Sequence, residues 1–126
     1  MGTTHVNVTV SPLTGGKRSF DASFLVDTGA IDCLAPASAL KKIGIKPVRT
    51  RTYELADGRS ARYQLGFARI SFLGHETVVQ IAFGPEKCEP LLGVVALENV
   101  AMVVDPATNT LRQLRASMLK PVPALA

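Results

Sequence analysis

Apolar and polar residues alternate from His5 to Val10, which is the pattern of a strand with one buried face. A second strand is expected from Arg18 to Val26. The segment between them contains the proline and glycines typical of a turn, Ser11-Pro12-Leu13-Thr14-Gly15-Gly16. The first quarter of the chain therefore predicts two strands joined as a hairpin.

A short helix and a second hairpin are predicted next. Residues Pro36 to Ile43 begin with a proline, which suits a first helical turn, and end in a lysine pair followed by Gly44. The strands expected at residues 50–55 and 60–65 flank Asp57-Gly58. This dipeptide is a two-residue signal for a tight hairpin turn with positive φ.

The remaining pattern predicts more short strands and one further helix. Strands are expected at residues 69–73 and 77–83, a helix at 94–99, and a final hairpin made of 101–105 and 111–114. Short strands separated by turn signals indicate an all-β barrel or sandwich with one or two short helices. A length of 126 residues without a linker predicts a single domain over 1–126, with a core at about 5–115 and a C-terminal tail at 116–126.

The composition, 47% hydrophobic and 19% charged, is that of a globular protein. The N-terminus lacks the pattern of a signal peptide, and the apolar stretches are too short to cross a bilayer, so no membrane partner is expected. Cys33 and Cys88 are expected to be free, reduced thiols in a cytoplasmic protein. Two cysteines and two remote histidines do not form a metal-ligand pattern, so neither a metal nor another cofactor is expected.

The net charge is +4, and seven of the fourteen Lys and Arg residues lie between Lys41 and Arg62. The simplest interpretation is a solvated basic face. The alternative is a field that steers an acidic peptide or partner towards a nearby cleft. No nucleic-acid partner is expected, because only Tyr53 and Tyr63 could stack on bases here and no binding motif is present.

The clearest candidate for chemistry is Asp27, in the segment Phe24-Leu25-Val26-Asp27-Thr28-Gly29-Ala30. An apolar strand that ends on a carboxylate carries an ionisable group towards a dry interior, which is costly unless the charge is hydrogen-bonded or used. The alternative is a structural role, since Asp often caps turns. No second Asp-Thr-Gly or Asp-Ser-Gly occurs in the chain.

Three motifs in order resemble those of the retropepsin-like (retroviral-type, clan AA) aspartic proteases, in particular small bacterial single-domain members. They are the Asp27-Thr28-Gly29-Ala30 loop, the Leu55-Ala56-Asp57-Gly58 hairpin, and Glu89-Pro90-Leu91-Leu92-Gly93 followed by a helix and Val103-Val104-Asp105-Pro106. The resemblance implies the β-barrel of that family, with a flap hairpin over the active site. It also implies an aspartic endopeptidase that acts on peptides or unfolded proteins.

The resemblance also implies roles for individual residues. Asp27 would be the catalytic carboxylate, Thr28 would bond to the partner's loop, and Gly29 would donate its amide to a carboxylate. Because the family's chemistry needs two aspartates and this chain supplies one, the enzyme would be a homodimer whose two Asp27 carboxylates activate a water. Substrate would lie against five further residues: Ala30, Asp32, Ala56, Asp57 and Gly58. Taken alone, Asp32 reads as a local cap or pocket wall, and Asp57 as a turn former.

One departure concerns the dimer. Retroviral enzymes usually place an Asp two residues after their Gly and an Arg just after the second apolar-apolar-Gly, whereas this chain has Ile31 and Val94. An ion pair is thus expected to be replaced by a packed apolar contact. The tail, Pro121-Val122-Pro123-Ala124-Leu125-Ala126, is a poor strand because prolines cannot donate ladder hydrogen bonds. The rival hypothesis is a dimeric peptide-binding or regulatory module with the same fold and little or no activity.

Overall fold

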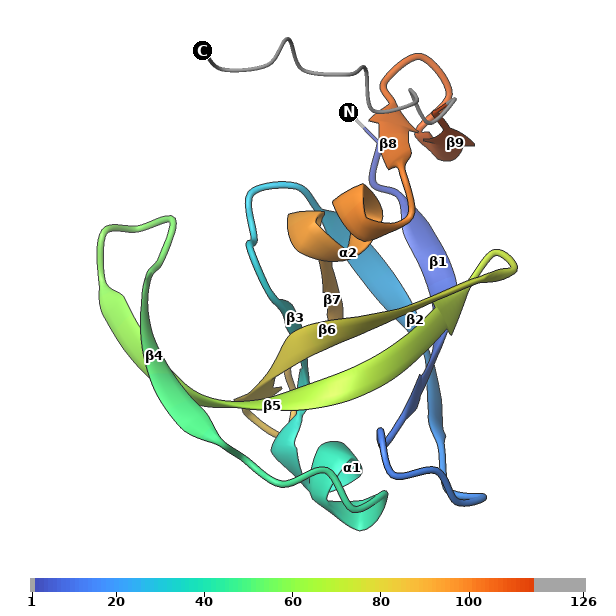
Figure 1. Ribbon diagram of the computed structural model, residues 1–126. Helices are drawn as coiled ribbons and strands as arrows, with labels where there is room; N and C mark the ends of the chain where they lie inside the picture. The colour runs from blue at the N-terminus through green and yellow to red at the C-terminus, as the bar shows by residue number, and fades with distance from the viewer. Residues whose placement is uncertain (1, 115–126) are drawn as a thin grey trace, which may run out of the picture.

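The first predicted strand places every second side chain in the core, where Val6, Val8 and Val10 are buried. The computed structural model describes residues 2–114 of the chain. Their elements follow in this order (Figure 1): β1 (His5–Ser11), β2 (Phe20–Asp27), β3 (Cys33–Pro36), α1 (Ala37–Lys42), β4 (Arg49–Glu54), β5 (Ser60–Phe72), β6 (His75–Gly84), β7 (Leu91–Gly93), α2 (Val94–Asn99), β8 (Met102–Asp105) and β9 (Thr110–Gln113).

Six strands close into a barrel, which confirms the predicted all-β fold. Their order is β1-β2-β7-β3-β6-β5, and β1 also pairs with β5 through Thr9, Val10 and Ser11. The interior is filled by apolar side chains, among them the fully buried Phe24 and Ile70. Both predicted helices are present, as is the last hairpin, which forms a separate two-stranded sheet of β8 and β9.

Strand β7 joins two segments that are distant in the sequence. It runs parallel to β2, so that Leu91 lies beside Leu25 and Gly93 beside Asp27. On its other side it pairs with β3, where Leu34 lies opposite Leu91. A loop connects the end of β2 at Asp27 to the start of β3 at Cys33, and β7 pairs with both of these strands.

Strand β5 is one continuous strand of 13 residues, although two strands at 60–65 and 69–73 were predicted. Its buried face changes midway: Leu65 and Gly66 are both buried, and Phe67 is exposed. The strand packs closely against Ile45 and Lys46 at this point, and only glycine leaves room for that contact. A Cβ on Gly66 would lie 2.9 Å from the Lys46 carbonyl oxygen and 2.9 Å from Ile45 Cγ2. The break in alternation therefore marks a change of environment and not the end of the strand.

Strand β3 was missed, because four residues of mostly apolar character show no alternation. The turn between β4 and β5 also differs from the prediction. Leu55 accepts a bond from the Gly58 amide at 2.9 Å and donates to the Arg59 carbonyl at 2.7 Å, which makes a three-residue loop. Gly58 has φ 85° and Asp57 lies outside the positive-φ region, so the predicted two-residue turn is wrong.

The β4–β5 hairpin projects from the barrel on the side away from the β8–β9 sheet (Figure 1). No helix among residues 2–114 is long and apolar enough to cross a membrane. The predicted tail at 116–126 lies outside the described residues.

Candidate active site

Asp27 is held at the point where β2 leaves the barrel. The strand before it is anchored on both sides, since the Leu25 amide donates to the Pro90 carbonyl at 2.9 Å and the Val26 amide to the Thr4 carbonyl at 2.8 Å. Asp27 itself is half-buried. Its Oδ1 accepts a hydrogen bond from the Gly29 amide at 3.0 Å, so one carboxylate oxygen is fixed by the turn that follows.

The loop after Asp27 is supported from below by β7 and α2. The Val94 amide donates to the Ala30 carbonyl at 2.8 Å. Gly93 lies directly under the loop, because a Cβ there would be 2.5 Å from the Asp32 carbonyl oxygen and 2.9 Å from that of Ile31. The close approach of the two backbones requires glycine at this position. Leu91-Leu92-Gly93 therefore lies beside β2 and beneath the Asp27 loop.

A cleft of about 830 Å³ lies between the Asp27 loop and the β4–β5 hairpin. Five of the predicted site residues line it, and these are Asp27, Gly29, Ala30, Asp32 and Ala56. Three others are not part of its lining, namely Thr28, Asp57 and Gly58. The floor and walls are largely apolar, with Leu34, Ala82 and Leu91 below and Tyr53 and Tyr63 on the hairpin side.

Asp57 is occupied within its own turn. Its Oδ1 accepts from the Arg59 amide at 3.0 Å, and its Oδ2 accepts from Arg59 Nε at 2.6 Å. These contacts are those of a turn-forming residue, as the sequence around Asp57 indicates. Thr28 is exposed, and its bond to the loop of a second chain stays a prediction.

Asp32 is the buried acid of the cleft, with a side chain only 5% exposed. Its Oδ2 accepts hydrogen bonds from Arg51 Nη1 at 2.6 Å and from the Tyr53 hydroxyl at 2.6 Å. Burial and the bond to Asp32 raise the pKa of Tyr53, so its hydroxyl remains a neutral donor. Arg51 and Tyr53 were not among the predicted site residues. Their spacing of two along a strand shows that they share a face, but not which acid they meet.

The two cysteines are free, as predicted. Cys33 is buried in the core, and this burial raises the pKa of its thiol to about 11. Within the described part of the chain, no group of three His, Cys, Asp or Glu side chains is arranged to hold a metal ion.

Three arginines of the basic segment between Lys41 and Arg62 have partners of their own. Arg51 is paired with Asp32, Arg59 with Asp57, and the Arg49 guanidinium carbon lies 5.8 Å from the centre of the Phe67 ring. The lysines of this segment are exposed, which fits the simpler interpretation of a solvated surface.

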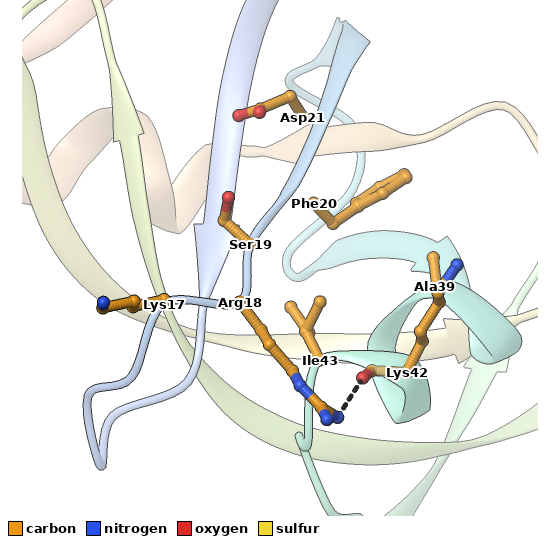
Figure 2. A pocket seen from close by; sticks show the side chains of 8 residues that line it. All are labelled: Lys17, Arg18, Ser19, Phe20, Asp21, Ala39, Lys42 and Ile43. Carbon is orange, nitrogen blue, oxygen red and sulfur yellow. Dashed lines mark hydrogen bonds between the residues drawn. The ribbon is translucent and has the colours of Figure 1, made fainter.

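A second hollow, of about 770 Å³, lies at the opposite end of β2 (Figure 2). Lys17, Arg18 and Lys42 surround it, and Arg18 Nη1 donates to the Lys42 carbonyl at 3.1 Å. Among residues 2–114, the acid in its lining is Asp21, which accepts a bond from the Thr9 hydroxyl. About seven residues of extended strand separate this hollow from Asp27, roughly 23 Å, so it is distinct from the candidate active site.

The chain is similar to known proteins in both sequence and fold. Residues 6–104 match the family described as aspartyl protease. The solution structure of the simian foamy virus (mac) protease superposes with a TM-score of 0.54 and 13% sequence identity, covering 75% of this chain and 91% of that chain. No curated protein matches the chain. The family match over most of the chain and the shared barrel together show that this protein belongs to the retropepsin-like aspartyl proteases.

Proposed function

We propose that the protein is a homodimeric aspartic endopeptidase in which each chain contributes one Asp27. The observation that carries this proposal is the set of hydrogen-bond partners of the acids that line the cleft. Asp27 has one oxygen fixed by the Gly29 amide and faces the cleft, whereas Asp32 is bound to Arg51 and Tyr53. Among residues 2–114, the remaining cleft acid is Glu54, which lies on the projecting hairpin. A second Asp27 from another copy would complete the pair.

The exposed side chains of the Asp27 loop support such an assembly. Thr28 is exposed, and Ile31 is 50% exposed although it is a large apolar residue. Burying Ile31 against a second copy would remove apolar surface from water. Ile31 stands where retroviral enzymes carry an acid, so this contact would be apolar.

The proposed chemistry follows from holding two carboxylates close together. When they are about 3 Å apart they cannot both ionise easily, so the pair shares one proton, as in known aspartic proteases. The charged carboxylate takes a proton from a water, whose oxygen attacks the scissile carbonyl, while the neutral carboxylate donates its proton to the carbonyl oxygen. Transfer of a proton to the amide nitrogen then allows the C–N bond to break, which releases an amine and a carboxylic acid.

The β4–β5 hairpin is proposed to be the flap of this enzyme. Residues Arg51 to Ala56 line the cleft from the hairpin side, opposite Asp27. A peptide lying extended between the hairpin and the loop would be shielded from bulk water, which strengthens the electrostatic interactions of the dyad.

The direct test is an Asp27→Asn variant assayed on an unstructured protein substrate. The substitution keeps the size of the side chain and removes the carboxylate, so we expect cleavage to be lost while circular dichroism and sedimentation match the parent. The activity of the parent should also be sensitive to pepstatin. Equal cleavage by the variant, with contaminating protease excluded, would contradict the proposal. A parent that binds peptides without cutting them would support the rival binding module.

A further inference from the structure

We propose that Asp32, Arg51 and Tyr53 form a clasp that positions the β4–β5 hairpin over the Asp27 loop during cleavage. This inference rests on the proposed function for its kinetic consequences, but the clasp itself is a feature of the single chain. Its three members come from two elements, with Asp32 on the loop that follows β2 and the other two on β4.

The clasp is the direct side-chain link between the hairpin and the loop within the described residues. Both bonds converge on one oxygen, Asp32 Oδ2, at 2.6 Å from Arg51 Nη1 and 2.6 Å from the Tyr53 hydroxyl. Charge-assisted bonds of this length are among the stronger ones in proteins. They fix strand β4 of the hairpin, while Asp57 in the turn bonds only within that turn.

Burial makes the link difficult to break. The Asp32 side chain is 5% exposed, and that of Arg51 is 32% exposed. A buried carboxylate that loses its partner keeps the cost of desolvation, so removing one member should affect the others. Asp32 lies at the end of the Asp27 loop, directly before β3. The clasp therefore sets the distance between the hairpin and that loop.

Asp32 is therefore a positioning residue and not a second catalytic acid. Its Oδ2 is already occupied by two donors, and the raised pKa of Tyr53 keeps that hydroxyl protonated. The clasp also neutralises the charge of Arg51 at the cleft wall. Asp32 was predicted to contact the substrate. In this proposal it instead fixes β4 at the wall of the cleft and does not bind the peptide directly.

Tyr53→Phe tests this inference, and Tyr63→Phe is its matched control. Both tyrosines line the cleft, and their ring centroids are 5.8 Å apart. The Tyr63 hydroxyl has no hydrogen bond to residues 2–114, so the control removes the same atom without touching the clasp. Each substitution is made in the parent and in the Asp27→Asn background.

In the Asp27→Asn background, amide hydrogen exchange of residues 53–61 is measured. We expect Tyr53→Phe to speed exchange there by about tenfold, the effect of losing one charge-assisted bond, and Tyr63→Phe to leave it unchanged. This measurement needs no activity, so its outcome does not depend on the proposed function. Unchanged exchange in Tyr53→Phe, or an equal increase in both variants, would overturn the clasp.

In the active protein, the expected signature is a separation of KM from kcat. A loosened hairpin should raise KM about tenfold and leave kcat within about twofold. The reason is that the intact hairpin binds the substrate equally well in the ground state and in the transition state. The pH profile should keep its shape, since Tyr53→Phe changes no charge. Adding Tyr53→Phe to Asp32→Asn should add little to the effect of Asp32→Asn alone, because Asp32 is the acceptor of both bonds. A fall in kcat with KM unchanged, or additive effects, would contradict a positioning role.

Discussion

Two aspartates of the cleft, Asp27 and Asp32, differ in what their carboxylates can do. Asp27 is held on one side by the Gly29 amide, which leaves the rest of the group free for proton transfer. Asp32 is engaged by Arg51 and Tyr53 through a single oxygen. The contrast lies in the partners and not in the residue type, and it supports the proposals that Asp27 carries the chemistry and that Asp32 positions the hairpin.

Thiol reactivity gives a prediction at the same scale. Burial raises the pKa of Cys33 to about 11, so at pH 8 only about one molecule in a thousand carries its thiolate. Cys88, which is partly buried, has a pKa raised chiefly by desolvation, but its sulfur is more accessible. We expect a thiol reagent at pH 8 to label Cys88 first and Cys33 only after unfolding, as measured by mass spectrometry.

The Cys88→Ser variant provides the control for this experiment. Its native form should take up almost no label on the timescale on which the parent reacts, and its unfolded form should take up one. Because the thiolate fraction rises with pH, labelling of Cys33 should speed up between pH 9 and pH 11. Rapid labelling of Cys33 in the native variant at pH 8 would show that the core around β3 opens easily.

At the scale of elements, the position of the site depends on β7 lying between β2 and β3. Gly93 pairs with Asp27 across the parallel ladder, and it also touches the backbone of Ile31 and Asp32. One short strand thus sets both the position of the Asp27 loop and the start of α2.

Gly93→Ala should reveal this dependence. The added Cβ would lie 2.5 Å from the Asp32 carbonyl oxygen, so the loop must move, and we expect a loss of about 1–3 kcal/mol in the free energy of unfolding. Specific activity of the folded fraction should fall as well. Unfolding in urea and an activity assay on the same samples measure the two effects.

Gly74→Ala is the control for that prediction. Its φ of 80° makes an alanine strained by about 1 kcal/mol, but a Cβ there meets no other atom. Gly74 lies in the turn between β5 and β6, outside the cleft lining. The variant should lose stability and keep its specific activity. Equal loss of activity in the two variants would mean that activity follows stability and not the geometry of the loop.

Local patterns predicted those parts of the fold and site that depend on neighbouring residues. The His5–Val10 alternation, the helix at 94–99 and the turn that presents Asp27 were all readable, because each is decided within a few positions. The partners of Asp32 lie 19 and 21 residues away, and the sequence does not state which acid a distant arginine will meet. The continuity of β5 was hidden by its change of buried face at Gly66.

At the scale of the whole molecule, the proposed active site needs two chains. A closed barrel carries the Asp27 loop on one side, and Thr28 and Ile31 are exposed on that loop. Each chain would then contribute half of the catalytic pair, so activity belongs to the dimer. The homodimer and the cytoplasmic location remain predictions.

The central claim, that one catalytic pair contains Asp27 from both chains, is tested most directly by mixing. Parent and Asp27→Asn chains are unfolded together in varying ratios, refolded at constant total concentration, and assayed for cleavage. If every active site needs two intact Asp27 residues, activity follows the square of the parent fraction, and an equal mixture retains about one quarter of the parent activity. A linear decline, with about one half retained at equal mixing, would show that each chain acts alone and would contradict the account.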